Sequence, residues 1–348
     1  MNCHINPQNN NVVYGELYYG ILFKTSDFGL HTSNITPPEE FDLNGVGKGD
    51  WLTPFHMNQK KGNELWAAYK RVYKSTTSGN DWQPISPVFS EFDNITTLSI
   101  SPSDQRTIYA SYKDVLWKTS NGGNTWDTIP GKLPENTITS VTISPNDKNA
   151  LCVTLSGFND TAKVFQSNDG AKTWKNISKG LPNIPINCSR YIHNSNQALI
   201  IGTDVGVYYR TASDTTWRNI NGTLPTVIVN DIEIDTTKEK IVIATYGRSI
   251  WETDLLKDSI VTVYADFISN TNQVCTGDSG LVTFTDNSSI PFDTYMWDFG
   301  DSAKPRTASG IGPHTVSYMT KGSKDISLTV KKGDIERSVV KRELLKAD

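Results

Sequence analysis

The stretch "KTSNGGNTWDTI", residues 118–129, decides the fold of this chain. Its two adjacent glycines and Asn121 favour a tight turn, because glycine tolerates positive φ and asparagine can hydrogen-bond its own backbone. Thr125 and Trp126 follow the turn, and both residue types favour a β-strand. The stretch therefore predicts a hairpin tip with an aromatic residue on its outgoing strand.

The same pattern recurs along the chain at regular intervals. It is found as "KSTTSGNDW" ending at Trp82, "QSNDGAKTW" ending at Trp174 and "YRTASDTTW" ending at Trp217. Consecutive tryptophans of the series are 43 to 48 residues apart. An earlier copy, "KTSDFGLHT" from Lys24, keeps the turn but has Thr32 at the tryptophan position. Fixed spacing of this kind indicates a repeat architecture.

Each copy of the turn is preceded by further strand-like segments, as in "SISPSDQRTIYASYKDVLWKTS" (99–120). A sixth unit, "IEIDTTKEKIVIATYGRSIWETD" (232–254), has the strands without the turn motif. Four short antiparallel strands per repeat are the pattern of a β-propeller blade. The sequence therefore predicts an all-β propeller over residues 1–257 with six recognisable blade units. Whether six blades close alone or belong to a seven-bladed or tandem propeller stays open.

The repeated turn resembles the Asp-box of BNR-repeat propellers, a group that includes sortilin-type ectodomains and xyloglucanase-like hydrolases. Its pattern is Ser/Thr-x-Asp-x-Gly-x-Thr-Trp, and the resemblance covers about residues 3–254. In those families the acidic or amide side chain bonds the turn's own amides, while the tryptophan packs between sheets. The resemblance implies a structural role for Asp27, Trp82, Asn121, Trp126, Asp169, Trp174 and Trp217.

A different pattern begins after the repeats end. The segment "YMWDFGDS" (295–302) resembles the core motif of the polycystic-kidney-disease (PKD) repeat, and its surroundings alternate like short strands. We therefore expect an Ig-like PKD β-sandwich over residues 258–348, with Trp297 in its core. Asp298 and Asp301 are expected to form a turn. Calcium binding is the alternative role for them, although two carboxylates make a poor calcium site.

Composition narrows the classes of function. A net charge of -4 gives no electrostatic footprint for nucleic acid. No apolar run approaches the length of a membrane span, and the four cysteines have no metal-like spacing, so neither a metal nor another cofactor is expected. PKD-like modules are typical of extracellular proteins, so we expect secretion or cell-surface display. The chain carries no export signal, and we therefore expect it to be part of a longer polypeptide.

The turns between the second and third strands of the units are expected to form a binding face, because function in propellers is carried by loops. Aromatic and charged residues recur there and in the insertion at 42–56. The expected face comprises Tyr18, Tyr19, Trp51, Tyr69, Lys70, Tyr112, Lys113, Tyr246 and Arg248. Such side chains suit a polysaccharide or a protein partner. The competing interpretation is that tyrosine is simply a good strand residue in a repeated unit.

Three functions remain in competition. The leading hypothesis is a non-catalytic binding module. The second is a glycoside hydrolase, since "GTDVG" around Asp204 resembles a turn that carries a catalytic Asp in xyloglucanase-like enzymes. An inverting hydrolase needs a second carboxylate roughly 6.5 to 9.5 Å away, and Glu16, Asp50 and Asp114 are the candidates. The third is a structural spacer within a larger adhesin.

Overall fold

The structure is a computed structural model. It describes residues 3–42, 44–129, 133–158, 161–193, 195, 197–255, 264–277, 280–288, 291–333 and 335–348. The chain divides into two compact units, Met1–Trp217 with Asn221–Leu255 and Leu256–Asp348 with Arg218–Ile220. The expected boundary at 257/258 lies outside the described residues.

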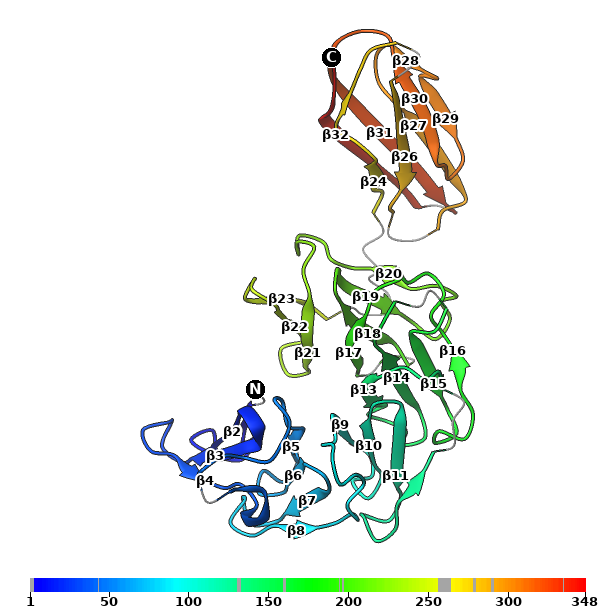
Figure 1. Cartoon of the computed structure of the whole chain (residues 1–348). Helices are drawn as coiled ribbons and strands as arrows, with labels where there is room; N and C mark the ends of the chain where they lie inside the picture. The colour runs from blue at the N-terminus through cyan, green and yellow to red at the C-terminus, as the bar shows by residue number, and fades with distance from the viewer. Residues whose placement is uncertain are drawn as a thin grey trace. The chain divides into compact units, whose positions relative to one another are not determined.

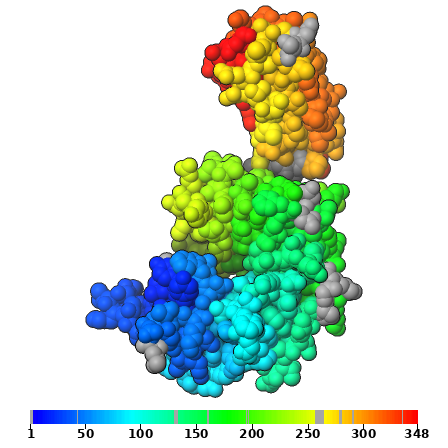
Figure 2. All heavy atoms as spheres, in the orientation of Figure 1, coloured from blue at the N-terminus to red at the C-terminus, as the bar shows by residue number. Residues whose placement is uncertain are grey.

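The first unit is built from antiparallel sheets that follow one another in chain order (Figure 1). The described residues form six of them, and in each the strands are hydrogen-bonded in sequence order. In Figure 2 the surfaces of successive sheets adjoin one another from blue to green. The fold is all-β, as predicted, and the only helices among the described residues of this unit are two 3-10 turns, η1 (Tyr18–Gly20) and η2 (Pro38–Glu40).

The first three sheets have four strands each. Sheet 1 comprises β1 (Cys3–Ile5), β2 (Val13–Leu17), β3 (Ile21–Thr25) and β4 (Ser33–Asn34). Sheet 2 comprises β5 (Phe55–Met57), β6 (Leu65–Ala68), β7 (Val72–Ser75) and β8 (Gln83–Pro84). Sheet 3 comprises β9 (Thr97–Ile100), β10 (Ile108–Tyr112), β11 (Val115–Thr119) and β12 (Asp127–Thr128).

Sheets 4 and 5 repeat this plan, and sheet 6 has three strands. Sheet 4 comprises β13 (Ile138–Ile143), β14 (Leu151–Leu155), β15 (Val164–Ser167) and β16 (Lys175–Asn176). Sheet 5 comprises β17 (Ile186–Tyr191), β18 (Leu199–Thr203), β19 (Gly206–Arg210) and β20 (Arg218–Asn219). Sheet 6 comprises β21 (Val229–Asp235), β22 (Lys240–Thr245) and β23 (Ile250–Asp254).

The repeated turn is closed by its own side chains. In the copy at 118–129 the Thr119 hydroxyl accepts the amides of Asn121 and Gly123, at 3.3 and 3.0 Å. Asn121 in turn accepts the amide of Thr125 at 3.0 Å. In the next copy the Asp169 carboxylate accepts the amide of Thr173 at 2.9 Å. The hydroxyl and amide of Thr173 hold the pKa of the Asp169 carboxyl well below its ordinary value. The turn thus returns the chain to the outermost strand with its polar groups paired.

Three of the four tryptophans that follow the turn are hydrogen-bonded to the preceding sheet or to the segment that leaves it. The indole N–H of Trp82 donates to the carbonyl of Ile35 at 2.6 Å, and Trp126 donates to Ile85 at 2.7 Å. Trp217 donates to Ile177 at 2.6 Å. The acceptor is always the isoleucine three residues beyond the tryptophan position of the preceding repeat.

The series has two exceptions. Trp174 packs in the same hydrophobic cluster as Ile129, the equivalent isoleucine, but its buried indole N–H has no acceptor among the described residues. In sheet 1 the tryptophan position is Thr32, which carries no indole donor. The turn alone therefore does not ensure the hydrogen bond between repeats: Thr32 lacks the donor, and the Trp174 donor lacks an acceptor among the described residues.

Alternation along the strands gives each sheet two packing faces. In sheet 2, Ala67 and Tyr73 point toward sheet 1 and join Tyr14 and Leu22 in one hydrophobic cluster. We call this the preceding-side face of a sheet. On the other side, the following-side face, Trp66 packs with residues of sheet 3. A sheet of this kind needs a neighbour on both sides to bury its apolar residues.

The second unit contains two sheets around one core. One sheet comprises β24 (Phe267–Ser269), β26 (Leu281–Asp286), β28 (Ala303–Lys304) and β30 (His314–Tyr318). The other comprises β25 (Gln273–Val274), β27 (Thr294–Asp298), β29 (Thr307–Ser309), β31 (Gly322–Lys332) and β32 (Ile335–Ala347). Trp297 is buried among Phe267 and Phe299, and its indole N–H donates to Gly310 at 3.0 Å.

The indole bond between repeats can be removed by Trp82→Phe. The substitution leaves the buried Ile35 carbonyl without its donor, and an unpaired buried group costs about 1–3 kcal/mol. We expect the free energy of unfolding, measured by urea denaturation and circular dichroism, to fall by that amount. Trp51→Phe, at an exposed position, is the matched control and should change it by less than about 0.5 kcal/mol. Equal effects of the two substitutions would contradict this role for the bond.

Candidate functional site

The turns after the second strands lie on one side of the first unit, which we call the turn face. The strand register locates these turns, because the last residue pair of each hairpin lies at this end. These pairs are Leu17 with Ile21, Ala68 with Val72 and Thr203 with Gly206. The innermost strands begin at the same end, since Phe55 pairs with Ala67. The loops that enter the innermost strands therefore belong to the turn face as well.

An aromatic platform of Tyr18, Tyr19 and Trp51 stands on the turn face. The rings of Tyr18 and Trp51 are stacked, with centroids 4.8 Å apart and an interplanar angle of 25°. Tyr19 meets Trp51 edge-on at 5.7 Å. All three side chains stay substantially exposed, at 47%, 45% and 55%. Exposed aromatic rings gathered in one place are a candidate binding surface, because water solvates their faces poorly.

The loops hold this platform in one conformation. Tyr19 has a φ of 62°, and its carbonyl accepts the amide of Gly49 at 2.9 Å. A Cβ on Gly47 would lie only 2.1 Å from that carbonyl oxygen, so the close approach of the two loops requires glycine there. The Asp50 carboxylate accepts the amide of Trp51 at 2.7 Å. The rings are thus presented by a fixed backbone, which lowers the entropy cost of binding.

The other residues expected on the binding face include side chains open to solvent and residues held by a hydrogen bond to a neighbouring group. Tyr246 is exposed, and the Lys113 ammonium lies 4.9 Å from the ring centre of half-buried Tyr112. The ammonium of Lys70 bonds the carbonyl of Glu91, and the carbonyl of Arg248 accepts the indole N–H of Trp251.

Tyr69 departs from the expectation. Its side chain is fully buried and its hydroxyl donates to the Gly20 carbonyl at 2.5 Å. It packs between sheets 1 and 2, because at its position the strand still faces the preceding sheet.

Several exposed apolar residues of the turn face are absent from the sequence-based set. They are Leu17, Leu52, Phe92, Phe158, Ile228 and Ile250. Phe92 and Phe158 lie in turn segments rich in polar residues, "SEFDN" and "SGFND", where a lone phenylalanine has no strand to pack against. A lone phenylalanine in a polar turn segment was the sequence signal that could have identified these two residues as exposed. With the platform they make the turn face apolar at many points.

The four candidate carboxylates come from different parts of the first unit. Glu16 is buried in sheet 1, and its carboxylate accepts the amide of Thr53 at 2.8 Å, so it does not face a substrate in solution. Asp50 caps the amide of Trp51. Asp204, after β18, accepts an amide N–H of Asn187 at 3.0 Å. Asp114 is exposed in the turn after β10.

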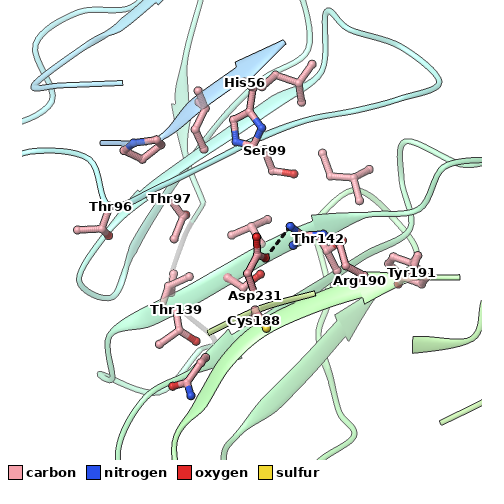
Figure 3. Close-up of a pocket in the computed structure, with 18 of the residues that line it drawn as sticks. His56, Thr96, Thr97, Ser99, Thr139, Thr142, Cys188, Arg190, Tyr191 and Asp231 are labelled. Atoms are coloured by element: carbon pink, nitrogen blue, oxygen red, sulfur yellow. Dashed lines mark hydrogen bonds and ion pairs between the residues drawn. The ribbon is translucent and has the colours of Figure 1, made fainter. Parts of the chain in front are cut away.

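A cavity of about 980 Å³ lies among the innermost strands of sheets 2 to 6 (Figure 3). It reaches the turn face at Leu52 and Thr96, and the opposite ends of the strands at Pro102 and His193. Its lining is rich in hydroxyl groups. The labelled ones in Figure 3 are those of Thr96, Thr97, Ser99, Thr139, Thr142 and Tyr191.

One arginine carries the charge at the centre of this cavity. The guanidinium of Arg190, on β17, donates to Asp231 at 2.9 Å and to Glu233 at 2.7 Å. Burial opposes its charge, but the two carboxylates raise its pKa above the ordinary value. Burial likewise raises the pKa of Asp231, against the opposing effect of Arg190. The ion pairs join sheets 5 and 6, and sequence reasoning missed them because the partners are some forty residues apart.

His56 projects into the same cavity from β5. Its pKa is lowered to about 3, first by burial and also by the nearby His4 and Arg190. The pKa of His4 is lowered as well, mainly by burial, and its Nε2 lies 2.9 Å from the carbonyl of Phe55. Both imidazoles are therefore neutral at physiological pH, and the cavity holds one compensated cation among hydroxyl groups.

The second unit places a cation beside the carboxylates that were considered for calcium. Arg306 lies 3.7 Å from Asp298 and 3.4 Å from Asp301. Asp298 also accepts the amide of Gly300 at 2.9 Å, which closes the turn. Within the described residues of the chain, no group of three or more His, Cys, Asp or Glu side chains is placed to hold a metal ion.

Comparison with solved structures relates this architecture to known folds. The chain is similar to YCF48 from Cyanidioschyzon merolae, with a TM-score of 0.53 and 14% identity over 82% of this chain and 92% of that one. It is similar to the GH74 xyloglucanase from Xanthomonas campestris, with a TM-score of 0.55 and 10% identity over 98% of this chain and 65% of that one. The chain contains a β-propeller.

Further comparisons bear on the propeller only at the level of fold. A structure of YCF48 bound to D1 peptide matches with a TM-score of 0.51 and 10% identity, over 83% of this chain and 89% of that one. No protein-family model matches the sequence, and no curated protein matches it. Among the described residues, no helix has the length and apolar character that crossing a membrane requires.

The neutrality of His56 makes the propeller sensitive to acid. The unfolded chain takes up a proton on this imidazole near pH 6.5, whereas the folded chain does so only near pH 3. Between these values the unfolded state binds more protons, so stability falls as pH drops through this range. We expect the free energy of unfolding of His56→Gln to fall by about 3 kcal/mol less than that of the wild type between pH 7 and pH 4, measured by urea denaturation.

The exposed His31 supplies the control for this comparison. His31→Gln should keep the wild-type pH dependence, since its ion pair with Asp27 is at the surface and such pairs contribute little. A His56→Gln variant with the same pH dependence as the wild type would show that the folded and unfolded states bind this proton equally.

Proposed function

We propose that this chain is a non-catalytic binding module that holds its partner on the turn face of the propeller. The observation that carries the proposal is the platform of Tyr18, Tyr19 and Trp51, whose rings are exposed yet fixed by their loops. Tyr and Trp are the residues that most often dominate binding energy at protein surfaces. The arrangement offers apolar contact area without an ordering cost.

A protein segment with apolar side chains suits this face best. Exposed aliphatic residues, among them Leu52 and Ile250, accompany the aromatic rings. Aliphatic side chains add favourable area against apolar protein groups, whereas sugar hydroxyls gain little from them. The similarity in fold to YCF48 bound to D1 peptide agrees with a peptide-sized ligand.

A polysaccharide is the second candidate, and the stacked rings of Tyr18 and Trp51 support it, because flat aromatic faces pack against sugar rings. The likeness to the GH74 xyloglucanase fits this candidate too. Hydrolysis has less support, because Glu16, one of the candidates for the second carboxylate, is buried and already bonded to the amide of Thr53.

We further assign the repeated turns to the Asp-box and residues 264–348 to a PKD-like sandwich. The side-chain hydrogen bonds of Asn121 and Asp169 and the buried Trp297 support these assignments. Both kinds of module belong mostly to exported proteins, and we propose a secreted or cell-surface location on that ground. A spacer role would require the turn face to bind nothing.

The substitution Trp51→Ala tests the binding proposal. The probes are a displayed library of linear peptides and an array of soluble polysaccharides that includes xyloglucan. We expect peptides enriched in apolar residues to bind, and Trp51→Ala to weaken them by roughly 30-fold or more, the effect of losing a hot-spot residue. Phe28→Ala, an exposed aromatic residue in the repeated turn of sheet 1, should leave binding unchanged.

The same experiment separates the competing functions. Selective binding to a polysaccharide, also lost in Trp51→Ala, would replace the peptide with a glycan. Release of sugar that disappears in Asp204→Asn would overturn the proposal in favour of a hydrolase. Binding that persists in Trp51→Ala would place the site elsewhere.

A further inference from the structure

A lysine connects the two sheets of the second unit. Lys341, on β32, shares one side of that strand with Val339, which packs against the hydrophobic core. Its ammonium donates to the carbonyl of Phe267 at 2.6 Å and lies 5.0 Å from the centre of that buried ring. Lys341 therefore reaches from the sheet of β32 to β24 in the other sheet, and its side chain is only 31% exposed.

The carboxylate of Asp266 contacts two nitrogen atoms at once. Its Oδ1 lies 2.8 Å from the Lys341 ammonium, and its Oδ2 accepts the side-chain amide of Asn287 at 2.9 Å. An amine, a carboxylate and a carboxamide are thus held in one chain of contacts. A carboxylate in this position can take protons from the amine and give them to the amide nitrogen.

The backbone fixes Asn287 beside Asp266. Asn287 follows β26 directly, and its main-chain N–H donates to the carbonyl of Asp266 at 2.9 Å. The hydroxyl of Ser288 donates to the same carbonyl at 3.2 Å and accepts the amide of Asp266 at 3.1 Å. Groups held together in this way react as if at very high concentration, because their orientation is already set.

The first unit contains the same three groups in a different setting. Glu64 accepts the ammonium of Lys61 at 3.0 Å and the side-chain amide of Asn58 at 2.9 Å. These residues belong to one short turn, and the Lys61 side chain is 65% exposed, so water surrounds its ammonium. The Lys341 group differs because its amine spans two sheets and is mostly withdrawn from water.

We propose that Lys341 and Asn287 become joined by an isopeptide bond, with Asp266 as the acid–base group. The lone pair of the deprotonated Lys341 amine attacks the side-chain carbonyl carbon of Asn287 and forms a C–N bond, and the bond from that carbon to Nδ2 breaks. Two protons pass from the lysine nitrogen through Asp266 to the departing nitrogen, which leaves as ammonium. Asp266 returns to its carboxylate form, and no other reactant enters the step.

The bond ties the end of β26 to β32 and so links the two sheets of the second unit covalently. A link between distant parts of the chain stabilises a fold by restricting its unfolded state, as a disulfide does. Unlike a disulfide, it forms without an oxidant. This modification goes beyond the proposed binding function and does not depend on it.

The intact mass of the full chain, measured after denaturation, tests this proposal. We expect a mass that is lower than the sequence mass by one ammonia, and a tryptic digest in which the peptides containing Lys341 and Asn287 stay joined. Lys341→Arg retains a cation beside Asp266, and Asn287→Ala changes an exposed side chain, so both variants keep their fold. Circular dichroism checks this, and each variant should restore the full mass.

Lys61→Arg is the matched control and should leave the mass deficit unchanged. Asp266→Asn should show the full mass, because the proton relay is lost. A wild-type chain of full mass overturns the proposal, and so does a deficit that Lys61→Arg removes. A deficit that persists in Lys341→Arg also overturns it, since that result indicates a succinimide formed by Asn287 with the amide of Ser288. A linked Asp266→Asn chain would contradict the acid–base role of Asp266.

Discussion

The hydrogen bond from a tryptophan indole to a backbone carbonyl of the preceding repeat is the interaction on which the first unit depends. A four-stranded sheet of this size cannot bury both of its faces, and hydrophobic contact alone does not fix how two sheets slide along each other. The bonds from Trp82 to Ile35, from Trp126 to Ile85 and from Trp217 to Ile177 supply that fixed point. Alignment of the sheets in turn brings their turns to one face and their innermost strands around one cavity.

The features that could be predicted from the sequence are those that depend on neighbouring residues. The period of the tryptophans and the turn residues around Asn121 and Asp169 are local, so the four-stranded, all-β organisation followed from them. Exposure of Tyr18, Tyr19 and Trp51 also follows from local sequence, since all three lie in turns or in the insertion at 42–56.

What could not be predicted depends on contacts between distant repeats. Tyr69 occupies the same kind of turn as Tyr112, yet it is buried because Gly20 of the preceding sheet accepts its hydroxyl. The ion pairs of Arg190 require β17 and β21 to lie side by side, which no spacing in the sequence reveals. The burial of His56 has the same origin. The local sequence pattern thus predicted the strands and the exposed residues of the turn face. The side chains that are buried between sheets or line the cavity depend on tertiary packing.

The direction of the indole bonds has a consequence for how such a chain can change in length. In each of the three bonds the donor binds an acceptor in the preceding repeat. Each acceptor is a main-chain carbonyl, which any residue supplies. Duplicating or deleting one whole repeat would leave each remaining donor of these three bonds with an acceptor, whereas cutting a repeat in half would leave a buried indole N–H unpaired. Thr32 forms no such bond, so sheet 1 makes no demand on what comes before it. The hydrogen bonds therefore tolerate the gain or loss of complete repeats. They also tolerate substitution of the acceptor isoleucines, because the acceptor is the main-chain carbonyl.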